Sequence, residues 1–226
     1  MSDDFDAIVG DIDDELDLTL YADSTELADE VTVQILAAIE KGLKLKSQFH
    51  LVLTGGTLCV QISEALVNEF NADPDGFAGL HIWWSDERFV QADSLERNAF
   101  PFHKTVTNTA VVIHEVLASD VAKSIDDAVS DYALALENVD IDLNILGLGP
   151  DGHVASLFPG IADVDDLRTI FAITDSPKPP AARVSFTMSM INSADEVWIV
   201  AAGESKAEAV TKIIEGDISI PASYVR

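Results

Sequence analysis

The residues with the clearest chemical potential stand in the loop Asp151-Gly152-His153, which follows an apolar run over residues 143–148. The glycine lets the backbone turn sharply, so that the carboxylate and the imidazole can face one cleft. A carboxylate beside an imidazole fixes the ring tautomer and leaves the other ring nitrogen as a proton acceptor near neutral pH. A single loop histidine is often structural. Its place at a strand end nevertheless favours His153 as a general base and Asp151 as the residue that orients it.

A second candidate is a glycine pair between an apolar strand-like run, residues 49–53, and a helical pattern over residues 57–70. Backbone N–H groups in such a turn, together with the start of a helix, suit a phosphate group. We therefore take Gly55, Gly56 and Thr57 as candidate phosphate-binding residues. A tight turn without a ligand is the alternative, because glycine pairs occur in both settings.

A third candidate, Asp86-Glu87-Arg88, follows the apolar run over residues 80–85. Parallel sheets place ligands at the carboxyl ends of their strands. An arginine held by neighbouring acids can offer its guanidinium to a phosphate. Asn98 is either a further polar contact or the residue that begins a helix. A surface ion cluster after an edge strand is the alternative for the whole segment.

Two more basic residues are candidates. Lys206 follows a glycine at the start of a predicted helix, although the helix dipole prefers acids there, and this mismatch is expected if the ammonium binds an anion. An ordinary solvated lysine is the alternative. Arg183 follows a proline pair and has no local signal of its own.

The remaining histidines, His50, His81, His103 and His114, lack the spacing of metal ligands, and we interpret them as structural. Cys59 is the only cysteine, so no disulfide can form within the chain, and a reducing compartment fits. The sequence thus predicts no metal site.

The chain of 226 residues carries a net charge of −27, yet 48% of its residues are hydrophobic. This charge argues against nucleic-acid binding, which needs a basic face, and the apolar share predicts a packed core. A solvated acidic surface and a docking surface for a basic partner both remain open. If the protein handles phosphorylated molecules, its few basic residues must converge on the site.

Apolar runs are too short to span a bilayer, and the N-terminus lacks the features of a secretory signal. We therefore expect a soluble, cytoplasmic protein without a membrane partner.

Strand-like runs alternate with helical patterns from residue 18 onward, which predicts an α/β domain whose mainly parallel sheet is covered by helices on both faces. A capping box of Asp23 and Glu26 begins a helix over residues 25–41, and Gly42 ends it. Residues 1–17 are acidic and are interpreted as a flexible arm. Further strands are expected over residues 18–21, 111–114, 169–173, 183–187 and 197–201, and further helices over 122–137 and 204–214.

In this order the segments resemble the 6-phosphogluconolactonase family over residues 17–226. The matching segments are Thr54–Thr57, Trp84–Arg88 with Asn98, Gly147–Gly160, Ser176–Thr187 and Gly203–Lys206. The resemblance implies a single-domain three-layer sandwich, no cofactor, and hydrolysis of a sugar-phosphate lactone in the oxidative pentose phosphate pathway. It also implies roles for the candidates. Gly55, Gly56, Thr57, Arg88, Lys206 and Arg183 would hold the phosphate, His153 would activate water, and Asp86, Glu87 and Asn98 would line the site.

Two departures accompany the resemblance: Pro150 stands where polar residues are common, and the final strand and tail of the family are expected to be missing after residue 226. A hexosamine-6-phosphate deaminase or isomerase shares the glycine loop and the Asp-Gly-His turn, but it usually has Asp-Glu-Tyr where this chain has Asp86-Glu87-Arg88. A non-catalytic sugar-phosphate sensor is the second alternative.

Overall fold

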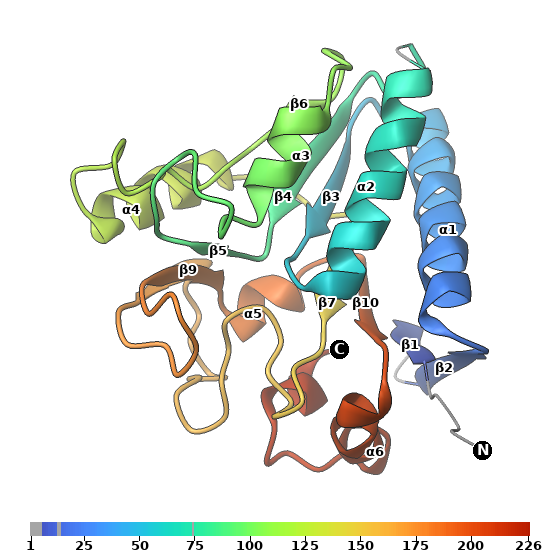
Figure 1. Ribbon diagram of the computed structural model, residues 1–226, viewed down its shortest axis with the longest axis vertical. Helices are drawn as coiled ribbons and strands as arrows, with labels where there is room; N and C mark the ends of the chain where they lie inside the picture. Colours follow the sequence, from blue (N-terminus) through green and yellow to red (C-terminus); the bar gives the residue numbers. More distant parts are fainter. Residues whose placement is uncertain (1–5, 13–14, 74) are drawn as a thin grey trace.

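A computed structural model describes residues 6–12, 15–73 and 75–226, and Figure 1 shows how their helices and strands are arranged. The order of elements along the chain is β1 (Asp6–Ile12), β2 (Glu15–Tyr21), α1 (Ser24–Leu45), β3 (Phe49–Leu53), α2 (Thr57–Ala72), β4 (Leu80–Trp84), β5 (Asp86–Arg88), α3 (Ala99–Thr105), β6 (Val112–Ile113), α4 (Ile125–Ala135), β7 (Leu143–Gly147), β8 (Ile170–Ile173), β9 (Arg183–Phe186), α5 (Met188–Ile191), β10 (Glu196–Ala201), η1 (Glu204–Lys206), α6 (Ala207–Glu215) and η2 (Pro221–Tyr224).

The larger sheet has the strand order β2-β1-β10-β7-β3-β4-β6. Strands β10, β7, β3, β4 and β6 run parallel to one another, and β1 joins them antiparallel to β10. A smaller antiparallel sheet, β5-β9-β8, lies on one side of the large one. The sequence predicts β8 and β9 as strands but does not indicate that they form a separate sheet.

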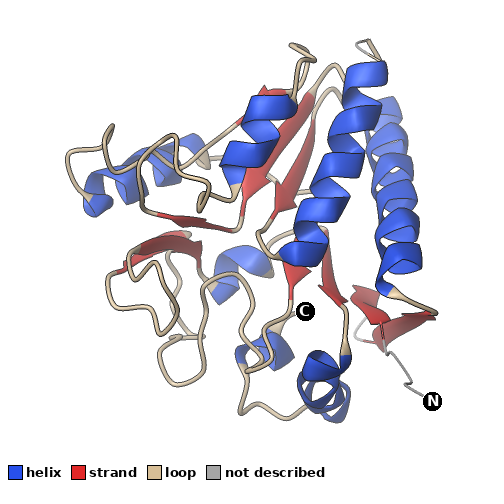
Figure 2. Ribbon diagram, viewed as in Figure 1, coloured by secondary structure: helices blue, strands red, loops and turns tan. Residues whose placement is uncertain are grey.

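Both faces of the central strands β3, β7 and β10 are covered. Alternate residues of one strand enter different apolar clusters: Leu51 and Leu53 pack with α1, α2 and α3, whereas Val52 packs with α4, α5 and α6 and the small sheet. Figure 2 shows helices on either side of the strands. The predicted three-layer α/β sandwich is thereby confirmed. Within the described ranges, none of the helices has the length and apolarity needed to cross a bilayer.

Topology explains where a site can form. After β3 the chain continues through α2 to the neighbouring β4, and it later returns to place β7 on the other side of β3. The chain therefore leaves the carboxyl ends of β3 and β7 in different directions, which opens a crevice between the segments that follow them. The glycine pair follows β3 and the Asp-Gly-His loop follows β7, so the two candidate segments face the same crevice.

The first helix begins as predicted but ends later. Asp23 Oδ1 accepts hydrogen bonds from the backbone N–H groups of Thr25 and Glu26, and Glu26 reaches back to the N–H of Ala22. The prediction that Gly42 ends this helix is wrong, since α1 continues to Leu45. A side chain at Gly42 would collide with the ring of Phe49, so the glycine serves close packing against β3.

The expectation of an arm over residues 1–17 is wrong for the residues that the structure describes there. Strands β1 and β2 form an antiparallel hairpin, which pairs Ala7 with Leu20 and extends the large sheet beyond β10. The leucines at positions 16, 18 and 20 alternate with polar residues, and this period-two pattern extends the strand expected over residues 18–21 back to Glu15. Residues 1–5, 13 and 14 of the expected arm lie outside the described residues. The division of the chain into an arm and one domain otherwise stays a prediction.

Candidate active site

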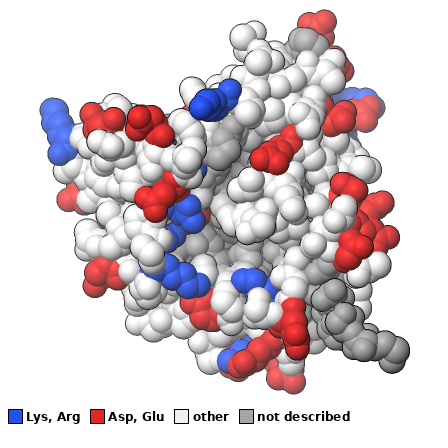
Figure 3. All heavy atoms as spheres, viewed as in Figure 1, with Lys and Arg blue, Asp and Glu red and all other residues white. Residues whose placement is uncertain are grey.

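A cleft of about 630 Å³ lies at the carboxyl ends of β3, β4, β7 and β10. Its walls come from the loops that follow these strands, and Figure 3 shows Lys and Arg side chains gathered around a hollow on this face. The predicted residues that line the cleft are Gly55, Gly56, Thr57, Asp86, Arg88, His153, Arg183 and Lys206. Segments distant in sequence therefore meet at one site.

The glycine pair forms the start of α2. Gly56 is the N-cap residue, with a positive φ of 103° that glycine adopts without strain, and no side chain caps the helix. The backbone N–H groups of the first turn thus have no intrahelical acceptor and face a cleft lined by Gly55, Gly56 and Thr57. This end of the helix is suited to bind an anion.

His153 and Asp151 form the predicted pair. His153 Nδ1 lies 2.5 Å from Asp151 Oδ1. Partial burial alone would raise the pKa of Asp151, but the hydrogen bond from His153, its charge and Lys178 lower it to about 2. An ionised carboxylate at this distance requires a proton on Nδ1, which leaves the lone pair on Nε2. Nε2 makes no hydrogen bond to any residue that the structure describes, so it is free to accept a proton.

Burial keeps the histidine neutral. It lowers the pKa of His153, against the opposing effect of Asp151. Close approach of the two side chains depends on a neighbouring glycine, because a side chain at Gly149 would collide with both His153 and Asp151. The arrangement is that of a general base with a fixed tautomer.

Lys178 also lines the cleft, and the sequence did not single it out. Its Nζ donates to Asp151 Oδ1 at 3.2 Å. The residue stands in the loop over residues 176–180, which precedes β9. The one signal that could have indicated it is its position as a basic residue between prolines, Pro177 and Pro179.

Arg88 and Lys206 are the cations with donors to spare. Nη1 of Arg88 donates a hydrogen bond to the backbone oxygen of Glu96, and its Nε has no partner within the described chain. Lys206 forms no ion pair with a described residue, and burial together with the charge of Lys178 lowers its pKa. With Lys178 and Arg183, these residues bring four of the thirteen basic side chains to one cleft. The expected convergence of positive charge is therefore present in an acidic protein.

Arg183 and Asp86 form the buried base of the cleft. Asp86 accepts hydrogen bonds from Thr54, Asn98 and Ser156, and its Oδ2 lies 3.7 Å from Arg183 Nη1. The other nitrogens of Arg183 donate to the backbone oxygens of residues 178, 179 and 180. Most donors of Arg183 are thus used within the protein, so it shapes the cleft more than it can bind an anion.

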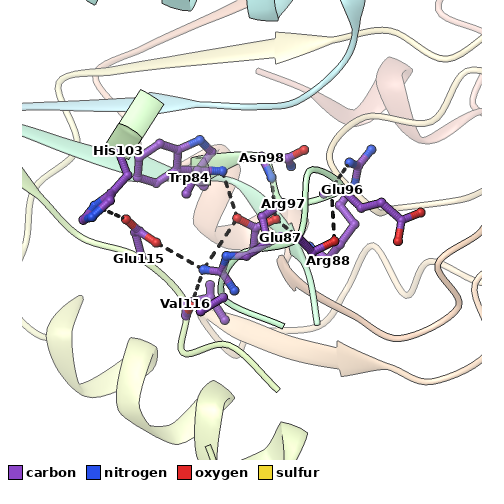
Figure 4. A network of polar contacts seen from close by, with 12 residues as sticks. Trp84, Glu87, Arg88, Glu96, Arg97, Asn98, His103, Glu115 and Val116 are labelled. Carbon is purple, nitrogen blue, oxygen red and sulfur yellow. Dashed lines mark hydrogen bonds and ion pairs between the residues drawn. The ribbon is translucent and has the colours of Figure 1, made fainter. Parts of the chain in front are cut away.

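Glu87 does not line the cleft, in contrast to the sequence-based expectation. Its buried carboxylate accepts hydrogen bonds from the backbone N–H groups of Arg88, Asn98 and Ala99, as Figure 4 shows in part. Burial raises the pKa of Glu87 to about 7, although Arg97 and these N–H groups oppose the shift. One carboxylate therefore closes the loop that carries Arg88 at one end and Asn98 at the other.

Arg97 extends this network away from the cleft. Its Nη2 lies 3.8 Å from Glu87 and 3.3 Å from Glu115, and it donates to the backbone oxygen of Val116. His103 lies 2.7 Å from Glu115.

Asn98 does not line the cleft either. It donates to the backbone oxygen and to Oδ1 of Asp86, and it packs where a side chain at Gly55 would have to go.

Three of the other histidines form a cluster on β3, on β4 and after β6. His81 Nδ1 lies 2.9 Å from His114 Nε2, and the ring of His114 stacks on Trp83 at 3.7 Å. His50 accepts a hydrogen bond from Trp83 Nε1. Within residues 6–12, 15–73 and 75–226, no group of three or more His, Cys, Asp or Glu side chains is arranged to hold a metal ion.

This histidine cluster makes stability depend on pH. Burial and the neighbouring histidines lower the pKa of His114 from 6.5 to about 4. Between these values the unfolded chain binds a proton that the folded chain does not, so stability falls as the pH falls from 6.5 toward 4.

We expect His114→Phe, which keeps the stacking, to remove about 2 kcal/mol of the loss of stability between pH 7.5 and pH 5. Urea unfolding at the two values measures this. An unaltered loss in His114→Phe would contradict the assignment.

The fold and the cleft define an α/β enzyme domain whose site lies at the carboxyl ends of parallel strands. The sequence pattern of the family described as glucosamine-6-phosphate isomerases/6-phosphogluconolactonase matches residues 22–226, and the chain belongs to that family. It is 31% identical to a 6-phosphogluconolactonase of Streptomyces coelicolor over 92% of this chain and 87% of that one. It is 37% identical to the 6-phosphogluconolactonase of Rattus norvegicus over 80% and 75% of the two chains. The crystal structure of the 6-phosphogluconolactonase from Thermotoga maritima matches with a TM-score of 0.72 and 26% identity, over 88% and 90%.

Proposed function

We propose that this protein is a hydrolase that opens 6-phospho-D-glucono-1,5-lactone to 6-phospho-D-gluconate, a reaction of the oxidative pentose phosphate pathway. The observation that carries the proposal is the free Nε2 of a neutral His153. Asp151 fixes this imidazole inside a cleft that is lined by four basic side chains. Relatives that share most of the chain carry the name 6-phosphogluconolactonase.

The histidine supplies both proton transfers. Nε2 of His153 takes a proton from water while the water oxygen adds to the lactone carbonyl carbon, and Asp151 stabilises the imidazolium that forms. The tetrahedral intermediate then collapses. The bond between that carbon and the ring oxygen breaks, and the ring oxygen receives the proton from Nε2. One water is consumed and the imidazole returns to its neutral form. No cofactor is needed for this chemistry.

The phosphate is held by the N–H groups of Gly55, Gly56 and Thr57 with Arg88 and Lys206, which line the same cleft. Arg183 supports the wall. We expect Arg88→Ala and Lys206→Ala to raise KM at least tenfold with a smaller change in kcat, because they remove binding that is shared by substrate and transition state. Steady-state kinetics test this, and Lys212→Ala on the surface of α6 is the matched control. A fall in kcat at unchanged KM would contradict this assignment and would show that these residues act in the chemical step.

The isomerase or deaminase alternative needs a carboxylate or other base that can move protons at a sugar carbon. Asp86 is the buried carboxylate of this cleft, and both of its oxygens are engaged by protein donors. These contacts leave neither oxygen free to reach a sugar carbon. A sensor without catalysis would not need the free Nε2 of His153.

Three substrates separate these functions: 6-phosphoglucono-1,5-lactone, the same lactone without phosphate, and glucosamine 6-phosphate. We expect rapid opening of the first, opening of the second with a KM at least a hundredfold higher, and no ammonia from the third. Release of ammonia would identify the deaminase. Binding of 6-phosphogluconate, seen as a rise in Tm, without turnover of any substrate would identify the sensor.

We infer a cytoplasmic location from Cys59, which is free and buried, as is typical of a reducing compartment. The net charge of −27 supports the inference that the protein does not bind nucleic acid. The sugar-phosphate lactone is the partner that the cleft is suited to bind.

A further inference from the structure

Lys178 is in contact with both members of the catalytic pair. Its Nζ lies 3.2 Å from Asp151 Oδ1 and 3.2 Å from His153 Nδ1. The three polar atoms therefore form one compact group at the wall of the cleft, and a single positive charge lies beside the imidazole.

The donors and acceptors of the three groups determine which hydrogen bonds Lys178 can form. A lysine ammonium has donors only, and Nδ1 of His153 already carries the proton that it donates to Asp151. Lys178 can therefore donate to Asp151 but not to Nδ1. There is no charge–charge repulsion between the ammonium and the ring while the imidazole is neutral. Such repulsion arises once Nε2 is also protonated.

The loop holds Lys178 in this place. Lys178 stands between Pro177 and Pro179, and the ring of each proline fixes its own φ angle. The backbone N–H of Lys178 donates to Ser176 Oγ at 3.3 Å, and its backbone oxygen accepts from Arg183 Nη2 at 3.2 Å. The ring of Phe158 lies 5.7 Å from Nζ and 4.6 Å from the imidazole, so it supports both side chains.

We propose that Lys178 is a positioning residue for the hydrolysis: it orders Asp151, opposes retention of the proton on His153 and so returns that proton to the leaving ring oxygen. This inference rests on the proposed function. Without the lysine, the effect of Asp151 on the imidazolium would be less opposed, and more of the enzyme would be protonated and inactive as the pH falls.

Other charges also face His153. Asp86 favours the imidazolium across the cleft, as Asp151 does, and burial opposes it. Lys206 lies close enough to Lys178 and Asp151 to be affected by both, and Arg183 lies over the Phe158 ring. Lys178 is the cation in direct contact with the imidazole, and this contact separates its effect from theirs.

The test is a ¹⁵N NMR titration of the His153 ring in the wild type, Lys178→Met and Lys178→Arg, with the signal assigned by its loss in His153→Ala. We expect the pKa of His153 to rise by about one unit in Lys178→Met and to stay near the wild-type value in Lys178→Arg, which keeps the charge. The acid limb of the kcat/KM profile should move by the same amount. Lys212→Met, which removes a surface charge outside the cleft, should change neither.

An unchanged His153 titration in Lys178→Met, with only a higher KM, would overturn the proposal and make Lys178 a substrate contact alone. If Lys178→Met does not fold, Lys178→Gln removes the same charge and is measured in its place. Because the titration needs no substrate, a protein that fails to hydrolyse the lactone yet shows the shift would refute the proposed function and leave the effect of Lys178 standing.

Discussion

Replacement of His153 by alanine should lower kcat by roughly 10² to 10⁴ fold while KM changes little. The imidazole is the group in the cleft with a free nitrogen lone pair, because Asp151 holds the proton on the other nitrogen. Its removal takes away the acceptor for the proton of water but leaves the basic side chains of the cleft in place. Initial rates with freshly generated lactone measure the loss, after subtraction of spontaneous opening.

The matched control is His103→Ala, which removes an exposed histidine that is paired with Glu115 and does not line the cleft. It should retain the wild-type kcat and KM. A His153→Ala enzyme with wild-type kcat would show that another group activates water.

Replacement of Asp86 by alanine should lower the free energy of unfolding by about 3 to 5 kcal/mol. The substitution leaves the buried guanidinium of Arg183 without its carboxylate, and it removes the acceptor shared by Thr54, Asn98 and Ser156. The loss is expected to exceed that of an ordinary core truncation, because an uncompensated buried charge remains. Urea unfolding near neutral pH provides the measurement.

Asp86→Asn should cost less, since an amide oxygen still accepts some of these hydrogen bonds. Asp131→Ala on the exposed face of α4 should change stability by under about 0.5 kcal/mol and serves as the control. If Asp86→Ala were no less stable than Asp131→Ala, the carboxylate would not be the centre of the buried network.

The sequence predicts the local parts of this site well. β3 has the predicted bounds and β7 differs by one residue, because each is an apolar run that ends at a glycine or polar loop. The proximity of Asp151 and His153 follows from their spacing and the glycine between them. These features depend on interactions within a few residues, which a sequence shows directly.

Features that depend on tertiary contacts were missed. Lys178 is 25 residues from His153 along the chain, and it reaches the imidazole only because β9 and its preceding loop fold back over the cleft. Glu87 stands next to Arg88 in the sequence, and it was expected to line the site. Its carboxylate instead points into the interior, where Arg97 and three backbone N–H groups lie. Strand β5 has three residues, too few for a periodic pattern.

The measurement that tests the account most directly is the opening rate of freshly generated 6-phosphoglucono-1,5-lactone, followed by NMR with and without a catalytic amount of the purified protein. The account predicts an acceleration that is proportional to protein concentration, saturates with substrate and produces 6-phosphogluconate without an intermediate that accumulates. Opening at the spontaneous rate, at every protein concentration, would contradict the assignment of this cleft to lactone hydrolysis.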